Sequence, residues 1–171
     1  LSLDFEPAVT NQTEVAVFAG GCFWGVEYYM SKIPGVESAK SGYVGGHVEN
    51  PSYKQVSYED TGHAEAVEVT FDPSKTSFEE LARVFFEIHD PTQKNRQGPD
   101  VGDQYRSAIF VQDIEQKKIA ENLIEKLKKR GYNVVTTIED AGPFWPAEKY
   151  HQDYYDKKGG TPYCHTRVKR F

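Results

Sequence analysis

The sequence has few cysteines: only Cys22 and Cys164 occur among its 171 residues. Small secreted domains that rely on disulfides are much richer in cysteine, so that class is excluded. The chain also lacks the closely spaced pairs of cysteine and histidine that structural zinc sites use. Two distant cysteines leave three interpretations open, namely inert buried thiols, a nucleophile with a bystander, or a redox pair.

Long apolar runs and an excess of positive charge are also lacking. No stretch approaches the ~20 apolar residues of a membrane span, and no basic segment followed by apolar residues opens the chain as in a signal peptide. The formal net charge of −6 at pH 7 gives no electrostatic reason to expect nucleic acid or an anionic membrane as a partner. A composition of 38% hydrophobic and 27% charged residues is typical of one globular domain.

Patterns of strand and helix alternate after a polar arm at residues 1–13. The expected strands are residues 14–19, 36–44, 64–71, 105–111 and the β-rich stretch 132–138, and the expected helices are about 24–33, 78–88 and about 114–130. The turn-rich segment at 47–63 is long enough to indicate function, and a second turn-rich segment spans 92–104. This pattern predicts that residues 14–171 form a single domain with an α+β fold. We expect a two-layer α/β sandwich around a central mixed sheet, a ferredoxin-like plait with additions, and a mobile tail from about residue 155.

The run GGCFWG at residues 20–25 follows a buried apolar strand and places Cys22 at the start of an expected helix. Backbone N–H groups at a helix N-terminus favour negative charge, so this position stabilises a thiolate. The flanking glycines allow close approach of another molecule, and Phe23 and Trp24 are suited to an apolar wall beside the sulfur. The run predicts a reactive thiol.

Glu65 lies in register with the apolar side chains Val67, Val69 and Phe71 of the expected strand 64–71. A carboxyl group on the buried face is partly desolvated, which raises its pKa. These patterns together indicate a thiol enzyme and leave its reaction open. One alternative is a cysteine hydrolase or acyltransferase, with His63 as base and Asp100 as its orienting partner. Another is a module that binds methionine-containing peptides without turnover.

Eight ordered motifs resemble those of peptide methionine sulfoxide reductase, type A, over about residues 14–165. They are GGCFWG (20–25), SGYVGG (41–46), NPSY (50–53), TGHAEAV (61–67), HDPT (89–92), QGPD (97–100), QYRS (104–107) and YHQ (150–152). The resemblance implies an oxidoreductase that reduces the S-epimer of free or peptide-bound methionine sulfoxide, an activity of protein repair and antioxidant defence.

The resemblance also implies roles for individual residues. Cys22 matches the nucleophile that attacks the sulfoxide sulfur, and Glu65 matches the acid that protonates the sulfoxide oxygen. Tyr53 and Tyr105 match the phenols that hydrogen-bond this oxygen. Three further residues match the substrate site: Phe23 and Trp24 in the pocket for the terminal methyl group, and Asp100 beside the substrate backbone. No metal or organic cofactor is implied.

Cys164 matches the resolving cysteine. Attack on the sulfoxide leaves Cys22 as a sulfenic acid, with which a second thiol condenses to a disulfide, and the resemblance implies thioredoxin as the reductant of that disulfide. Residues 163–167 also resemble forms in which a type B reductase domain follows on the same chain. We expect a monomer in the cytoplasm. If the chain is part of a bifunctional protein, the alternative is that this protein is exported or attached to the envelope.

Overall fold

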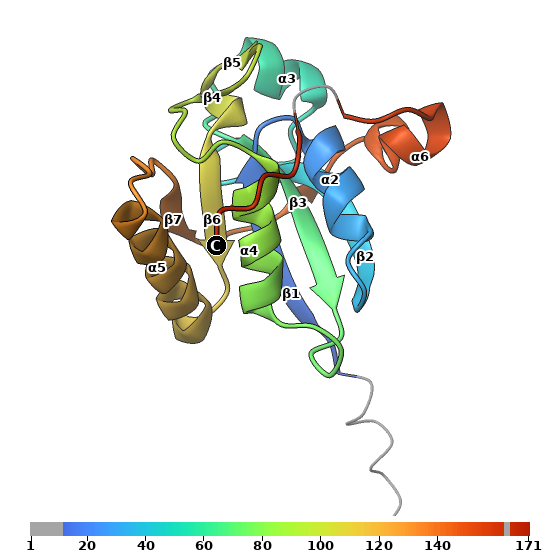
Figure 1. Ribbon diagram of the computed structural model, residues 1–171. Helices are drawn as coiled ribbons and strands as arrows, with labels where there is room; N and C mark the ends of the chain where they lie inside the picture. Colours follow the sequence, from blue (N-terminus) through green and yellow to red (C-terminus); the bar gives the residue numbers. More distant parts are fainter. Residues whose placement is uncertain (1–11, 163–164) are drawn as a thin grey trace, which may run out of the picture.

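The computed structural model describes residues 12–162 and 165–171 (Figure 1). The strands are β1 (Glu14–Gly20), β2 (Val36–Val44), β3 (Ala64–Phe71), β4 (Arg96–Gln97), β5 (Asp100–Val101), β6 (Ser107–Val111), β7 (Thr137–Asp140) and β8 (Trp145–Pro146). The helices are α2 (Phe23–Ser31), α3 (Tyr53–Tyr58), α4 (Phe78–Ile88), α5 (Ile114–Lys129) and α6 (Tyr154–Lys158), with short 3₁₀ turns η1 (Asp103–Tyr105) and η2 (Lys149–His151).

The main sheet has six strands in the order β7-β6-β1-β3-β2-β8. Its inner four strands, β6-β1-β3-β2, are antiparallel neighbours, and helices α2 and α4 connect β1 to β2 and β3 to β6. This is the ferredoxin-like arrangement. Helix α5 then adds β7, which runs parallel to β6, and β8 pairs with the opposite edge on β2. The predicted α+β fold with a mixed central sheet is confirmed.

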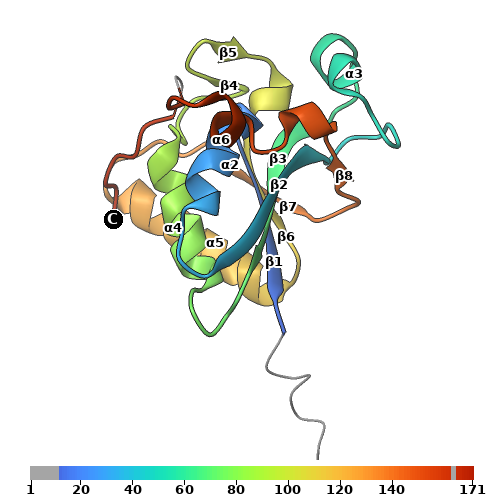
Figure 2. The same cartoon turned by 90° about the vertical axis from the view of Figure 1, so that its right-hand side faces the viewer.

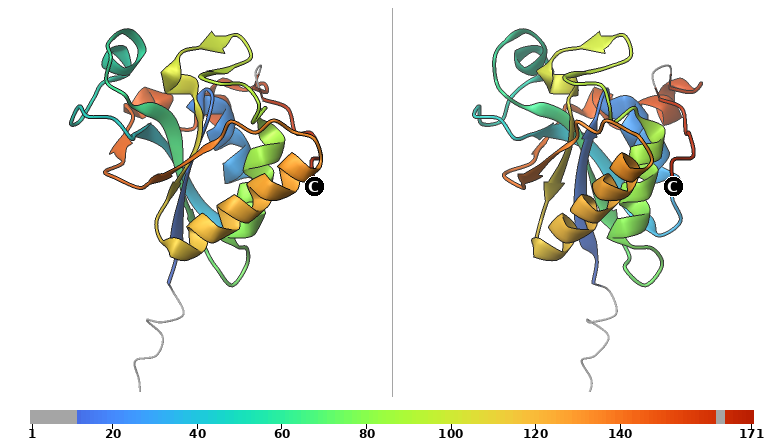
Figure 3. Two further views of the ribbon diagram at one scale, coloured as in Figure 1. Left: turned by 90° about the vertical axis from the view of Figure 1, so that its left-hand side faces the viewer. Right: turned by 60° about the vertical axis from the view of Figure 1, so that its left-hand side comes forward.

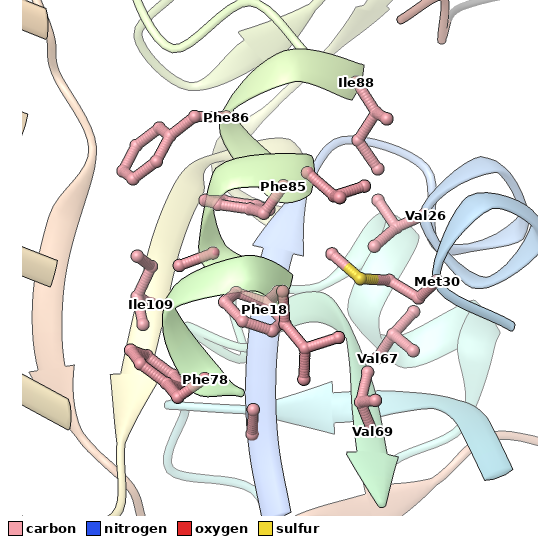
Figure 4. Close-up of a cluster of buried hydrophobic side chains, with 14 of the residues drawn as sticks. Phe18, Val26, Met30, Val67, Val69, Phe78, Phe85, Phe86, Ile88 and Ile109 are labelled. Carbon is pink, nitrogen blue, oxygen red and sulfur yellow. The ribbon is translucent and has the colours of Figure 1, made fainter. Parts of the chain in front are cut away.

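Helices α4 and α5 cover the same face of the sheet (Figures 2 and 3). Phe18 of β1 lies at the centre of the core on this face and stacks on Phe78 and Phe85 of α4. Met30 of α2 and Val67 of β3 belong to the same fully buried cluster (Figure 4). The strong amphipathic pattern of α4 therefore predicts its position correctly, because every apolar side chain it buries belongs to this one core.

The second face of the sheet has a smaller cluster, made of alanine and valine side chains around the ring of Phe110, and is covered by the segment after β7. Ala141 and Phe144 pack on this cluster. A Cβ atom at Gly42 of β2 would overlap the ring of Phe144, so glycine lets the segment lie directly on the strand before β8 pairs with it.

Three expectations differ from the structure. The strand expected from residue 105 begins at Ser107, because residues 103–105 form the 3₁₀ turn η1. Within 132–138, only Thr137 and Ile138 belong to a strand, which continues to Asp140. The turn-rich segment 47–63 contains helix α3, which the sequence reasoning missed. Ser52 and Gln55 form a complete capping box at its start, a pattern that could have revealed it.

The C-terminal residues lie against helix α4 (Figure 1). The backbone N–H of Val168 donates to the carbonyl of Glu87 at 2.7 Å. Arg170 donates through Nε to the carbonyl of Phe86 at 2.8 Å. Carbonyl groups in the last turn of a helix have no partner within it, so residues 165–171 satisfy groups that α4 leaves open.

Candidate active site

Cys22 stands between the end of β1 and the start of α2. Gly21 has a φ of 93°, a left-handed conformation that favours glycine, and it turns the chain sharply out of the sheet. Cys22 is then the N-cap residue of α2, and its carbonyl accepts from the N–H of Gly25 at 3.2 Å. Its side chain is 8% exposed. The predicted position of this thiol at a helix N-terminus is therefore correct.

Glu65 is 1% exposed and lies directly under the start of α2. Its Oε1 accepts from the backbone N–H of Phe23 at 3.2 Å. Its Oε2 is buried and makes no hydrogen bond within the described part of the chain. The pKa of Glu65 is raised to about 8, chiefly by burial; the hydrogen bond from Phe23 partly opposes this rise, and the negative charge of Asp100 adds to it. The carboxyl group is thus protonated at neutral pH, and its Oε2 has no hydrogen-bond partner among the described residues.

Strand register places Glu65 in the middle of the site. Tyr43 of β2 lies opposite Glu65 on one side. On the other side, Phe18 of β1 lies opposite Val67, and the same register extended by two residues brings Gly20 opposite Glu65. Because β1 ends where β3 begins, the sheet itself brings the carboxyl group to the turn that holds Cys22.

Tyr53 and Tyr105 approach the same point from two segments outside the sheet, Tyr53 as the first residue of α3 and Tyr105 as the last residue of η1. Both are half-buried. Burial raises the pKa of each phenol, and the charges of Glu65 and Cys22 are further causes in both cases. These mutual effects mean that the four groups lie close together, and both phenols stay protonated as hydrogen-bond donors.

Phe23 and Trp24 form part of a group of rings. The centroid of the Phe23 ring lies 6.3 Å from that of Tyr53 and 5.2 Å from that of His151. The indole Nε1 of Trp24 donates to Nδ1 of His151 at 3.0 Å. On its other side, Trp24 stacks on Tyr154, with 3.7 Å between ring centroids and planes only 4° apart. The contacts on both sides hold the indole ring in one orientation.

Asp100 is half-buried at the start of β5. Its negative charge raises the pKa of Glu65 and of Tyr105, so it belongs to the same neighbourhood. Cys164 lies outside the described residues. The structure therefore brings together Cys22, Glu65, Tyr53, Tyr105, Phe23, Trp24 and Asp100.

Sequence reasoning missed two residues that support the site. Glu148 accepts from the hydroxyl of Tyr43 and from the backbone N–H of Tyr53, both at 3.0 Å, and so ties α3 to the sheet. His151 is 1% exposed between the aromatic rings. The YHQ motif at residues 150–152 marks His151, whereas no local pattern marks Glu148.

His63, the base that a cysteine hydrolase would require, is occupied elsewhere. Its Nδ1 accepts from the N–H of Gly46 at 3.1 Å, and its Nε2 is bonded to the carbonyl of Val48 at 2.6 Å. Both ring nitrogens thus stabilise the loop after β2. Within residues 12–162 and 165–171 there is no cluster of three or more metal-ligating side chains, and no helix is long and apolar enough to cross a membrane.

Comparison with known proteins agrees with this geometry. Residues 14–171 match the family model described as peptide methionine sulfoxide reductase. The peptide methionine sulfoxide reductase MsrA 1 of Rhodopirellula baltica is 53% identical over 91% of this chain and 81% of its own.

Solved structures of Mxr1 from Saccharomyces cerevisiae share the fold. The reduced form has a TM-score of 0.85 at 36% identity, covering 98% of this chain and 96% of its own. Mxr1 in complex with Trx2 has a TM-score of 0.60 at 25% identity, covering 97% and 95%. This chain belongs to the peptide methionine sulfoxide reductase family.

Proposed function

We propose that this protein reduces the S-epimer of methionine sulfoxide, free or within proteins, and that Cys22 is the nucleophile. In the first step the Cys22 thiolate attacks the sulfoxide sulfur, and Glu65 delivers a proton to the sulfoxide oxygen. The hydroxyl group then moves from the substrate sulfur to the Cys22 sulfur as the bond between the two sulfurs breaks, so that methionine leaves and Cys22 becomes a sulfenic acid. The biological role is repair of oxidised proteins.

The observation that carries the proposal is the state of Glu65. A general acid has to hold its proton at the working pH, and burial raises the pKa of Glu65 to about 8. A buried carboxyl oxygen without a partner is also rare in proteins, and Oε2 of Glu65 has none among the described residues. A sulfoxide oxygen placed above Cys22 supplies that partner.

Tyr53 and Tyr105 complete the oxygen-binding group. Their raised pKa values keep both hydroxyls as donors. Two neutral donors near the oxygen stabilise negative charge that develops on it before proton transfer is complete.

The rings of Phe23 and Trp24 form the pocket for the terminal methyl group of the substrate. Phe23 is 1% exposed, whereas Trp24 is only partly buried and presents apolar surface at the rim. In this proposal Asp100, at the start of β5, accepts a hydrogen bond from the backbone of a peptide substrate.

Cys164 acts as the resolving cysteine in this proposal. Its thiol displaces the hydroxyl group of the Cys22 sulfenic acid, the disulfide forms and water leaves. Thioredoxin then reduces the disulfide by thiol–disulfide exchange. The solved complex of Mxr1 with Trx2 supports a thioredoxin partner.

We further propose that the chain works as a monomer in the cytoplasm, where thioredoxin keeps thiols reduced. The exposed large apolar side chains among the described residues come from separate elements. They are Tyr58, Val101, Ile114, Tyr150 and Val168. Fusion to a type B domain, with export or attachment to the envelope, is the alternative arrangement.

The proposal is tested by incubating the protein with the S- and R-epimers of a methionine sulfoxide peptide. The unmodified chain should release methionine from the S-epimer with either dithiothreitol or thioredoxin, and Cys22→Ser should release none. Cys164→Ser should turn over with dithiothreitol but not with thioredoxin. No methionine from the unmodified chain contradicts the proposal, and full activity of Cys164→Ser with thioredoxin excludes Cys164 as the resolving residue.

Glu65 is tested separately by two substitutions. Glu65→Gln should lose much less activity than Glu65→Ala, because a neutral amide still donates a hydrogen bond to the oxygen although it delivers no proton, whereas Glu65→Ala should lose about 100-fold or more. Glu68→Gln, on the same strand, is the matched control and should be unchanged. Equal losses in both Glu65 variants contradict the donor role.

A further inference from the structure

His165 is buried deeply although it lies close to the end of the described chain. Its side chain is 1% exposed. The ring nitrogen Nε2 is bonded to the carbonyl of Gly20 at 2.7 Å, and the carbonyl of His165 accepts from the hydroxyl of Tyr29 at 3.3 Å. Burial lowers the pKa of His165, so the imidazole is neutral and Nε2 carries the proton that Gly20 accepts. The ring therefore contacts the turn that carries Cys22.

Glycines create the space that His165 occupies. A Cβ atom at Gly25 would overlap the imidazole ring, and the three atoms nearest to it all belong to His165. A Cβ atom at Gly21 would lie 3.3 Å from Nε2 of the same ring. A glycine inside a helix costs roughly 0.5–1 kcal/mol relative to alanine. Gly25, which has no side chain, leaves a notch on the surface of α2, and the ring of His165 fills this notch.

The residues that follow His165 are also fixed. Glu87 of α4 is 6% exposed, and its Oε1 lies 2.8 Å from a guanidinium nitrogen of Arg167. Its Oε2 accepts from the backbone N–H of Arg170 at 3.1 Å. The guanidinium of Arg170 lies 5.2 Å from the ring centroid of Tyr132. Residues 165–171 consequently hold one position on α2 and α4.

We propose that His165 is a positioning residue for the second half of the reaction. It anchors the chain beside the Cys22 turn at the position directly after Cys164. Because one peptide bond joins residues 164 and 165, this anchor shortens the distance over which the Cys164 thiol has to search for Cys22. The effective concentration of one thiol at the other rises accordingly. This inference rests on the proposed role of Cys164 and adds the residue that makes its step fast.

The step that His165 accelerates needs only the Cys164 thiol and the Cys22 sulfenic acid as reactants. The Cys164 sulfur attacks the sulfur of the Cys22 sulfenic acid, the S–O bond breaks and the S–S bond forms. The hydroxyl group leaves as water with the proton of the Cys164 thiol. His165 takes no proton in this step, and its contribution is position alone.

The experiment compares the unmodified chain with His165→Ala, His165→Gln and Thr166→Ala. Glutamine carries a donor where the histidine has Nε2, and Thr166 is an exposed neighbour that serves as the matched control. Each reduced protein is mixed with a methionine sulfoxide peptide in the absence of any reductant. Released methionine reports the first step, and loss of free thiols, checked by the mass of the linked peptides, reports the disulfide.

His165→Ala should release one methionine per chain within twofold of the normal rate but form the disulfide at least about tenfold more slowly. Turnover should fall with thioredoxin and persist with dithiothreitol, which reduces the sulfenic acid directly. His165→Gln should recover part of the disulfide rate, and Thr166→Ala should match the unmodified chain.

Two results overturn the inference. One is disulfide formation by His165→Ala at the normal rate. The other is loss of methionine release in His165→Ala while the unmodified chain remains active, because His165 would then support the Cys22 turn itself. Thermal unfolding of each variant shows whether it is folded, and His165→Gln keeps the test valid if His165→Ala is not. If the unmodified chain releases no methionine, that result contradicts the proposed function rather than the role of His165.

Discussion

Glu65 holds a carboxyl group at a point where the sheet and the start of α2 together exclude water. Folding raises its pKa from 4.5 to about 8 through burial, so the folded chain binds more protons than the unfolded chain between these two values. The free energy of unfolding therefore decreases as the pH rises through this window. Loss of this proton destabilises the fold, and the same proton is the one that the proposed reaction uses.

Glu65→Gln should remove this pH dependence. Between pH 5 and pH 8.5, the unmodified chain should lose roughly 4 kcal/mol more stability than Glu65→Gln, because the amide does not ionise. Urea unfolding at several pH values measures the difference, with Glu68→Gln as control. Parallel curves for the unmodified chain and Glu65→Gln would mean that Glu65 is ionised at neutral pH in the folded state.

The rate of methionine release should have a matching pH dependence. The unmodified chain should lose activity as the pH rises through about 8, the pKa of Glu65, because the acid is then deprotonated. Glu65→Gln should lack this decline at high pH. Single-turnover rates between pH 6 and 9.5 measure it, and a decline that persists in Glu65→Gln has to be assigned to another group.

At the level of elements, the site depends on short segments whose ends are capped by side chains. Ser52 accepts from the N–H of Gln55 at 3.1 Å and starts α3, which carries Tyr53. Ser77 accepts from the N–H of Glu80 at 3.1 Å and starts α4, which carries no residue of the site. The two serines make the same capping bond, but only Ser52 caps a helix that carries a residue of the candidate site.

Ser52→Ala and Ser77→Ala should each cost about 1 kcal/mol of stability. Only Ser52→Ala should also lower kcat/KM, by about tenfold, because fraying of α3 displaces the hydroxyl of Tyr53 from the sulfoxide oxygen. Thermal unfolding and steady-state rates with dithiothreitol separate the two effects. Similar activity of both variants would show that Tyr53 does not depend on the cap.

Gly25 of α2 gives a second prediction, in which the effect of one substitution on stability changes sign with the residue at position 165. Gly25→Ala should destabilise the protein when His165 is present, because the new methyl group overlaps its ring. In a His165→Ala background the same substitution should be stabilising by about 0.5–1 kcal/mol, since alanine favours a helix. Urea unfolding of the four proteins measures the coupling, and additive effects would contradict the packing of His165 in the notch.

Across the whole molecule, Glu27 links three distant parts of the chain. This buried residue of α2 accepts from the hydroxyl of Ser41 in β2 at 3.1 Å. Its two carboxyl oxygens also accept from the N–H of Asp153, at 3.0 and 3.1 Å. Asp153 directly precedes α6, where Tyr154 stacks on Trp24. One side chain therefore joins the sheet, the helix beside Cys22 and the segment that stacks on Trp24.

Glu27→Ala should release residues 153–158 from helix α2. We expect trypsin to cleave after Lys157 and Lys158 several times faster than in the unmodified chain, because opening of α6 no longer breaks the bonds to Glu27. Glu37→Ala, an exposed position on β2, loses the same charge and serves as control. Equal cleavage rates in both variants would show that Glu27 does not hold α6.

The parts of the molecule that sequence predicts are those in which periodicity and burial coincide. β1, β2, β3, α4 and α5 have strong patterns because each buries regularly spaced apolar side chains in the core, and the alternation in β3 places Glu65 correctly. By contrast, α3, β8 and α6 are short and depend on partners far away in sequence, such as Glu148 and Glu27. Local patterns therefore identify Cys22 and Glu65, whereas the convergence of Tyr53, Tyr105 and His151 requires the folded chain or the family resemblance.

The docking of residues 165–171 on α4 has a consequence for synthesis of the protein. Translation produces the Cys22 turn among the first residues of the domain and the segment that contacts it among the last. A nascent chain can pair the inner strands while it is still attached to the ribosome, but the carbonyls at the end of α4 and the notch at Gly25 stay open to water until residue 171 has emerged. The Cys22 turn is therefore synthesised early but gains its contact with His165 late, so a chain that stops before residue 165 has the turn without this contact.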